Sequence, residues 1–241
     1  MAPSGDLHIV TAIIAVGAMA IGSAIQAALG IGLALFVVPI LALVDPTFVP
    51  GPMLLAGSAL TVLTAYRERD AIDRLGLAKS LLGLAAGTVI GAIALRYITG
   101  PGMQRVFGCL VLFAVLISVW GVPVAASARN LVLGGAAAGV MGTMVGIHGP
   151  AISLVFQNAE PRVARAMLGA FFTVAYLGSV LALALFHLFG MPEVMRGIVL
   201  LPGVGIGLLL APLVRRFVDR ARLRFAILGI AAVSGVLLVI K

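Results

Sequence analysis

The chain contains very little charge. Of its 241 residues only 10% are Asp, Glu, Lys or Arg, whereas 62% are hydrophobic, more than one soluble core of this length can bury. Six stretches of 18 or more residues have no charged residue at all: 7–44, 46–66, 106–128, 130–159, 166–192 and 197–214. About 20 apolar residues cross the hydrocarbon core of a bilayer as a helix, and these stretches lack the alternation of barrel strands. The sequence therefore predicts an all-α polytopic membrane protein.

Acidic residues and cysteine are also scarce, which limits the chemistry available. The single cysteine, Cys109, excludes an intrachain disulfide and a cysteine-built metal site. The eight acidic residues all fall in expected loops or termini: Asp6, Asp45, Glu68, Asp70, Asp73, Glu160, Glu193 and Asp219. A proton relay through buried carboxylates is therefore missing, as is the GxxxxGK[ST] motif of ATP-driven proteins. We expect neither an enzyme nor a cofactor or metal site.

Apolar runs and breakers divide the chain into ten helical segments. They cover roughly 8–29, 33–44, 51–66, 75–98, 103–120, 130–146, 150–158, 165–189, 194–214 and 224–240. Two of them, 33–44 and 150–158, are too short to span comfortably. Each follows a glycine-rich break, "LGIGLA" at 29–34 or "VGIHGPA" at 145–151.

The two breaks suggest an internal repeat. Shifting the sequence by 116 residues places Gly30 on Gly146 and Gly32 on His148, and the pair Gly87 and Gly91 on Gly203 and Gly207. Small residues four apart favour close helix packing in lipid. We therefore expect a first transmembrane repeat over 1–122 and a second over 123–241, within one integrated membrane domain.

The basic residues predict the orientation of these repeats rather than nucleic-acid binding. If the pairs 8–44 and 130–158 each make an even number of crossings, only four basic residues (Arg96, Arg105, Arg196 and Lys241) lie on one side. The other twelve share the opposite side: Arg67, Arg69, Arg74, Lys79, Arg129, Arg162, Arg165, Arg215, Arg216, Arg220, Arg222 and Arg224. The positive-inside rule makes that side cytoplasmic, with both termini outside.

The same charges indicate that the two halves are inverted. The dense basic loop lies between the third and fourth segments of the first half, but between the fourth and fifth of the second. Repeats inserted the same way up would carry equivalent loops. Inverted repeats around broken helices are a transporter architecture, with the binding site near the bilayer midplane.

The chemistry of a broken helix favours an anion. Glycine supplies the backbone freedom for the break, and Pro150 suits the first position of a new helix. Free amides and the positive dipole end of a helix N-terminus attract negative charge. Two such half-helix N-termini, with no lysine or arginine at the breaks, would form a site for a small anion. We expect Gly30, Gly32, Gly146 and Gly149 to contribute to it.

Polar side chains near the breaks complete the predicted site. His148 can donate to an anion, or gate transport by proton coupling; the alternative is a structural bond to a freed carbonyl. Gln26 lies one turn before the first break. Hydroxyls on the segments after the breaks are further candidates for substrate contact, although bonds to the preceding turn are an alternative for each: Ser58, Thr61, Thr173 and Tyr176.

The two break regions resemble the TauE/SafE sulfite exporter family, an anion permease family. Its members have two similar halves, each with a glycine-rich motif followed by an apolar run with proline. The copies here read "AALGIGLALFVVPILAL" and "GTMVGIHGPAISLVFQ", with Pro39 and Pro150 at the expected places. The resemblance implies transport of sulfite, sulfoacetate or another organosulfonate across the bacterial inner membrane. His148 departs from the family, where glycine is usual.

We therefore predict a secondary carrier or facilitator for a small sulfur-containing anion, with export preferred. An interior-negative potential favours anion exit by about 2.3 kcal/mol per charge per 100 mV. An anion channel and a structural membrane subunit are the alternatives. The sequence leaves the exact anion, the coupling and a homodimeric state open.

Overall fold

The structure, a computed structural model, describes residues 4–30, 32–98, 101–120, 124–217 and 219–240. These residues are all-helical and confirm each of the ten expected segments. The α-helices are α1 (Ser4–Leu29), α2 (Leu33–Val44), α3 (Gly51–Arg67), α4 (Arg74–Tyr97), α5 (Pro101–Trp120), α6 (Ala128–Val145), α7 (Gly149–Phe156), α8 (Pro161–Leu185), α9 (Met191–Phe217) and α10 (Arg220–Ile240).

Six of these helices are long and apolar enough to cross a membrane: α1, α4, α5, α8, α9 and α10. Large apolar side chains on the outside of the bundle are widely exposed, among them Leu209 (80%), Ile240 (75%) and Leu185 (70%). Such continuous apolar surface is unfavourable in water and suits a lipid environment. The chain is therefore a multi-pass membrane protein.

Two short 3-10 helices, η1 (Pro46–Phe48) and η2 (Arg69–Ala71), were not expected. The Asp45 side chain begins η1, because its Oδ1 accepts hydrogen bonds from both the backbone N and the hydroxyl of Thr47. Both helices lie in charged loops that join apolar segments, so the sequence showed the loops but not their local turns.

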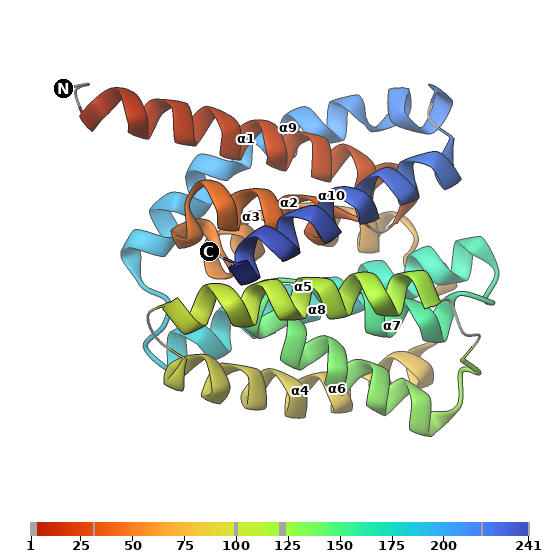
Figure 1. Cartoon of the computed structure of the whole chain (residues 1–241). Coiled ribbons are helices and arrows are strands. Elements are labelled where there is room, and N and C mark those ends of the chain that lie inside the picture. Colours follow the sequence, from red (N-terminus) through yellow and green to blue (C-terminus); the bar gives the residue numbers. More distant parts are fainter. Residues whose placement is uncertain (1–3, 31, 99–100, 121–123, 218, 241) are drawn as a thin grey trace.

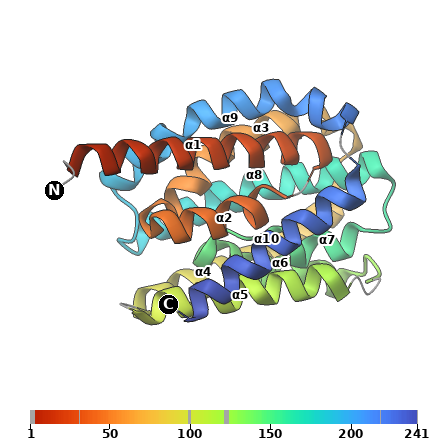
Figure 2. The ribbon, with the colours of Figure 1, turned by 45° about the horizontal axis from the view of Figure 1, so that its top comes forward.

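Helices of the first half pack mainly on helices of the second. The most extensive contacts pair α4 with α6, α1 with α9, α3 with α8 and α5 with α10, as Figures 1 and 2 show. Glycines permit the first two pairs to approach closely: a Cβ on Gly87 of α4 would overlap the carbonyl of Ala136, and one on Gly207 of α9 would lie 2.5 Å from the carbonyl oxygen of Ala20.

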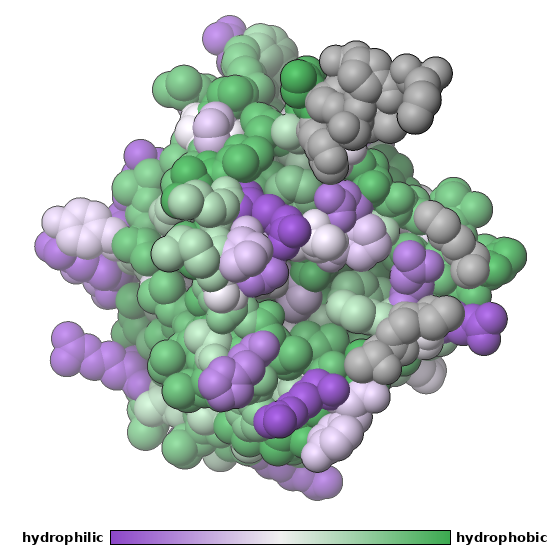
Figure 3. Space-filling view, turned by 90° about the vertical axis from the view of Figure 1, so that its left-hand side faces the viewer, coloured by the Kyte–Doolittle hydropathy of each residue, from purple (hydrophilic) through white to green (hydrophobic). Residues whose placement is uncertain are grey.

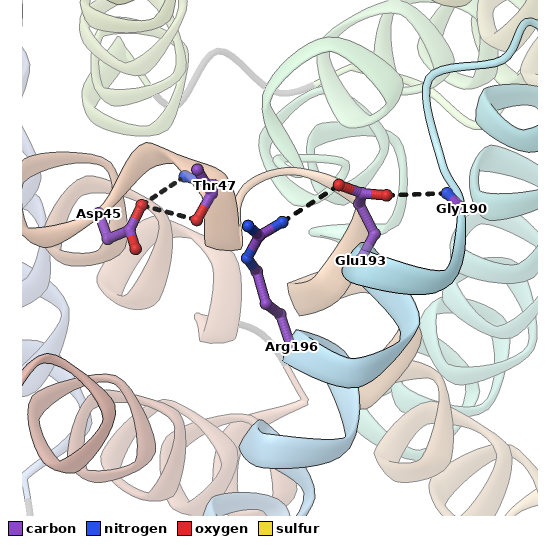
Figure 4. A network of polar contacts seen from close by, with 5 residues as sticks. All are labelled: Asp45, Thr47, Gly190, Glu193 and Arg196. Atoms are coloured by element: carbon purple, nitrogen blue, oxygen red, sulfur yellow. Dashed lines mark hydrogen bonds and ion pairs between the residues drawn. The ribbon is translucent and has the colours of Figure 1, made fainter. Parts of the chain in front are cut away.

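The helices run largely between two ends of the molecule. In Figure 1 the connections α2–α3 and α8–α9 lie at the left, where α1 also starts, and the connections α3–α4 and α7–α8 lie at the right. Figure 3 views the left end and shows hydrophilic side chains gathered there amid hydrophobic surface. A polar network secures this end (Figure 4): Glu193 accepts from Gly190 N at 2.8 Å and from Arg196 at 3.2 Å.

Candidate functional site

Both glycine-rich stretches interrupt their helices, as expected. Gly30 (φ +83°), Gly32 (φ +116°) and Gly146 (φ +84°) adopt left-handed conformations that other residues rarely tolerate. The new helices α2 and α7 then begin without a side-chain cap from the preceding residue. The Leu33 amide donates to Gln26 and Pro150 has no N–H, so it is the other first-turn amides that can meet a ligand.

One cavity of about 350 Å³ adjoins the start of both short helices. Its lining includes Gly32, which precedes α2, and Gly149, which begins α7. It also includes Ser153 of α7, whose buried Oγ has no hydrogen-bond partner among the described residues. The two breaks, far apart in sequence, thus face a common space that contains an unsatisfied hydroxyl.

A buried polar cluster fixes the ring of His148, which is not itself in the lining of this cavity although Ile147 and Gly149 are. The Nε2 atom of His148 is hydrogen-bonded to Ser179 Oγ at 3.1 Å, and the same Oγ is hydrogen-bonded to Thr143 Oγ1 at 2.9 Å. All three residues are at most 1% exposed. The ring's other nitrogen, Nδ1, is buried and makes no hydrogen bond within the described part of the chain.

Tyr176 connects this cluster to the first break. Its ring centroid lies 5.2 Å from that of His148, and its phenol lies near the Gln26 side chain. Gln26 Oε1 in turn accepts the amide of Leu33, the first residue of α2, at 3.3 Å. A continuous set of buried polar groups therefore runs from the start of α2 to the end of α6.

Two glycines make room for the aromatic members of this set. A Cβ on Gly142 would overlap the imidazole of His148, and one on Gly57 would lie 2.8 Å from Cε2 of Tyr176. Since real Cβ atoms essentially never approach so closely, both rings depend on the missing side chain.

The remaining hydroxyl groups predicted for the site are hydrogen-bonded to backbone carbonyls of their own helices. Ser58 donates to the carbonyl of Leu55 at 2.6 Å, and Thr61 donates to that of Ser58 at 3.0 Å. Thr173 donates to the carbonyl of Gly169 at 2.9 Å. These bonds correspond to the structural alternative that the sequence left open for each residue.

The break segments themselves contain no basic residue, but Arg165 of α8 packs against the first one. A Cβ on Gly30 would lie 3.1 Å from Cγ of Arg165, so the arginine stem covers the first break. Arg165 also lines the 350 Å³ cavity, together with Arg224. The sequence placed Arg165 at the start of the segment 165–189, and linear spacing cannot show that α8 returns to the first break.

Sequence reasoning also missed Thr143, Ser179 and Gly142. Thr143 and Ser179 are separated by 36 residues and read as ordinary helix hydroxyls. Gly142 lies one turn before a recognised break, the same spacing that singled out Gln26 before the first break. This spacing could have identified Gly142 from the sequence. It was overlooked because glycine has no functional group that would suggest a role in the site.

Broken helices around a common cavity, within a bundle of apolar spans, define a polytopic membrane transporter. The chain belongs to the sulfite exporter TauE/SafE family, whose model matches residues 13–238. Members of this family are transporters rather than enzymes, and the family implies an anionic substrate. No curated protein and no solved structure gives a significant match.

Proposed function

We propose that this protein is a secondary transporter or facilitator that exports a small sulfur-containing anion, sulfite or an organosulfonate, across the bacterial inner membrane. The observation that carries the proposal is the 350 Å³ cavity lined by the starts of both α2 and α7. In this proposal the two helices act as half-helices whose free amides hold the anion near the midplane.

The packing of the helices supports inverted repeats over 1–122 and 123–241. If α1 to α5 correspond to α6 to α10, exchanging the halves converts the α1–α9 contact into α6–α4 and leaves the α3–α8 and α5–α10 contacts unchanged. The glycine contacts agree, since Gly83 faces Val132 and Gly203 faces Val16. The two equivalent glycines, Gly83 of α4 and Gly203 of α9, are 120 residues apart. This separation is one helical turn longer than the 116-residue offset of the breaks.

The side chains assigned to the substrate surround the starts of the half-helices. Backbone at Gly30, Gly32, Gly146 and Gly149 approaches the anion, and Gln26, His148 and Tyr176 supply N–H and O–H donors. Ser58, Thr61 and Thr173 would contribute only after giving up their bonds to the preceding turn. His148 also serves as the gating or proton-coupling group of the proposal.

The orientation follows from the arginines. Arg67, Arg165 and Arg215 line one small cavity and Arg224 donates to the carbonyl of Ser118, so basic residues from both halves gather at one end. The positive-inside rule makes this end cytoplasmic and leaves both termini periplasmic. An interior-negative potential then drives anion exit without further coupling.

The deciding experiment measures flux of sulfite, sulfoacetate and an inorganic control anion, chloride, in proteoliposomes containing the purified protein. Saturable flux of a sulfur oxyanion, reduced by both His148→Ala and Gln26→Ala but not by Ser80→Ala, is the expected result. Ser80 is a suitable control because its buried hydroxyl bonds only its own helix, at the Leu77 carbonyl.

Four outcomes would contradict parts of the proposal. The absence of flux in the wild type would contradict transport of these anions by the chain alone. Unsaturable flux with single-channel currents would indicate a channel. Normal flux in both His148→Ala and Gln26→Ala would remove the site assignment, and a flat flux profile between about pH 5.5 and 7.5 would remove His148 as proton carrier.

A further inference from the structure

Another cavity, of about 70 Å³, lies beside the first break and shares Arg165 with the lining of the 350 Å³ cavity. We call it the arginine cavity. Its charged lining consists of Arg67, Glu68, Arg165 and Arg215, three guanidinium groups against one carboxylate. Its uncharged lining is Gln26, Ala27, Gly30, Thr64, Gly169 and Phe172.

The single carboxylate is only half satisfied. Arg165 Nε donates to Glu68 Oε1 at 2.8 Å, whereas Glu68 Oε2 is buried with no partner in the part of the chain that the structure describes. A buried carboxylate oxygen without a donor is costly. The Glu68 carboxylate is therefore a replaceable partner of Arg165 rather than a fully bonded one.

The arginine donors outnumber the acceptors that face them. Each guanidinium carries five N–H groups. Arg215 uses one for the carbonyl of Ala27 at 3.3 Å, a long bond to a neutral acceptor. Within the described residues, the side chain of Arg67 forms no hydrogen bond and no ion pair. The surplus donors suit a group with several anionic oxygens.

The arginine cavity shares two residues, Gln26 and Gly30, with the proposed binding site. Gln26 lies in its lining and accepts the first amide of α2, and the stem of Arg165 covers Gly30. Arg165 lines both cavities. It therefore lies between them, with its guanidinium bound to Glu68 in this structure.

We propose that the arginine cavity is a loading site for the oxyanion head group of the substrate, XO₃⁻, in which the anion replaces Glu68 on Arg165. The cavity has space for a few water molecules, the size of such a head group rather than of an organic chain. Breaking the Glu68–Arg165 pair frees the Arg165 side chain to move with the anion toward the larger cavity. This inference rests on the proposed function.

The test uses oriented proteoliposomes in which sulfite is supplied either from the side of the arginine cavity or from the opposite side. Arg165→Gln is expected to raise the half-saturating sulfite concentration about ten-fold or more from the arginine side only, because it removes charge-assisted hydrogen bonds. Glu68→Gln is expected to lower that concentration several-fold by removing the competing carboxylate. Arg162→Gln, on the same helix but outside the cavity lining, is the matched control.

Binding to purified protein in neutral detergent provides a second readout. Sulfite should raise the unfolding temperature of the wild type and of Glu68→Gln, and raise that of Arg165→Gln less. If Arg165→Gln does not fold, the Glu68→Gln result alone decides, since an unchanged half-saturating concentration there contradicts the loading site.

The outcomes separate this inference from the proposed function. Absent flux of both sulfite and sulfoacetate in the wild type contradicts both. Normal wild-type flux with equal half-saturating concentrations in Arg165→Gln and Arg162→Gln contradicts the loading site alone. An Arg165→Gln effect that appears with anionic lipid but vanishes in purely zwitterionic liposomes shows that the arginines hold lipid phosphate, which also overturns the loading site.

Discussion

The imidazole of His148 lies directly on the backbone of Gly142, so that any side chain at position 142 would overlap the ring. The left-handed turn at Gly146 folds the chain back and brings residue 148 over the last turn of α6. Ser179, on α8, then fixes Nε2 at 3.1 Å. The orientation of the ring therefore depends on a glycine, a turn and a hydroxyl from three separate parts of the chain.

Replacing Gly142 with alanine should displace this ring. The added methyl group meets a ring that is buried on all sides, and overpacking of this kind costs about 1–3 kcal/mol. We expect sulfite flux to fall about ten-fold or more and the unfolding temperature in detergent to decrease. The control is Gly178→Ala, where no atom lies within 4 Å of the new Cβ; equal effects of the two substitutions would contradict the packing argument.

Ser179→Ala should affect two partners at once. The substitution leaves the Thr143 hydroxyl and His148 Nε2 buried without their shared hydrogen-bond partner. Each such group costs about 1–3 kcal/mol, so a clear loss of thermal stability and a lower rate of flux are expected. Ser80→Ala removes a hydroxyl that is equally buried but bonds only its own helix, and should change the unfolding temperature little.

The fold could be predicted from the sequence because its signals are local. Apolar runs and breakers predict the ten helices, and glycine-rich stretches predict the breaks at Gly30 and Gly146. The polar cluster could not be predicted in the same way. Contacts such as that of Ser179 with Thr143 depend on how α8 packs against α6, and hydroxyl residues on other helices have the same sequence pattern while bonding only the preceding turn.

The position of Arg165 illustrates the same limit for charge. In sequence it follows a short apolar segment and stands at the start of the segment 165–189. In the structure its stem packs on Gly30 and its guanidinium reaches Glu68, a residue 97 positions away. Long basic side chains can extend along apolar surface from a helix end, so counting charges gives their side of the membrane but not the depth that they reach.

The close crossings of α4 with α6 and of α9 with α1 should be equally sensitive to larger side chains. Gly87→Val and Gly207→Val each place a side chain against backbone atoms, of Ala136 and Ala20 respectively, which cannot move without separating the helices. We expect each to destabilise by about 3 kcal/mol or more, measured as loss of monodisperse protein and of unfolding temperature. Gly205→Val, which meets no atom within 4 Å, should be tolerated; strongly unequal effects at 87 and 207 would contradict the proposed symmetry.

The proposed orientation predicts which loops face the cytoplasm. Asp70 lies in η2, at the end of the molecule that carries the arginine cavity, whereas Glu193 lies at the opposite end beside Gly190. In a Cys109→Ala background, which has no cysteine, Asp70→Cys and Glu193→Cys each introduce one label site. A membrane-impermeant maleimide added to intact spheroplasts should modify Glu193→Cys and leave Asp70→Cys unmodified until the membrane is permeabilised. The reverse pattern would place the arginine cavity outside, so that the same loading site would serve uptake rather than export.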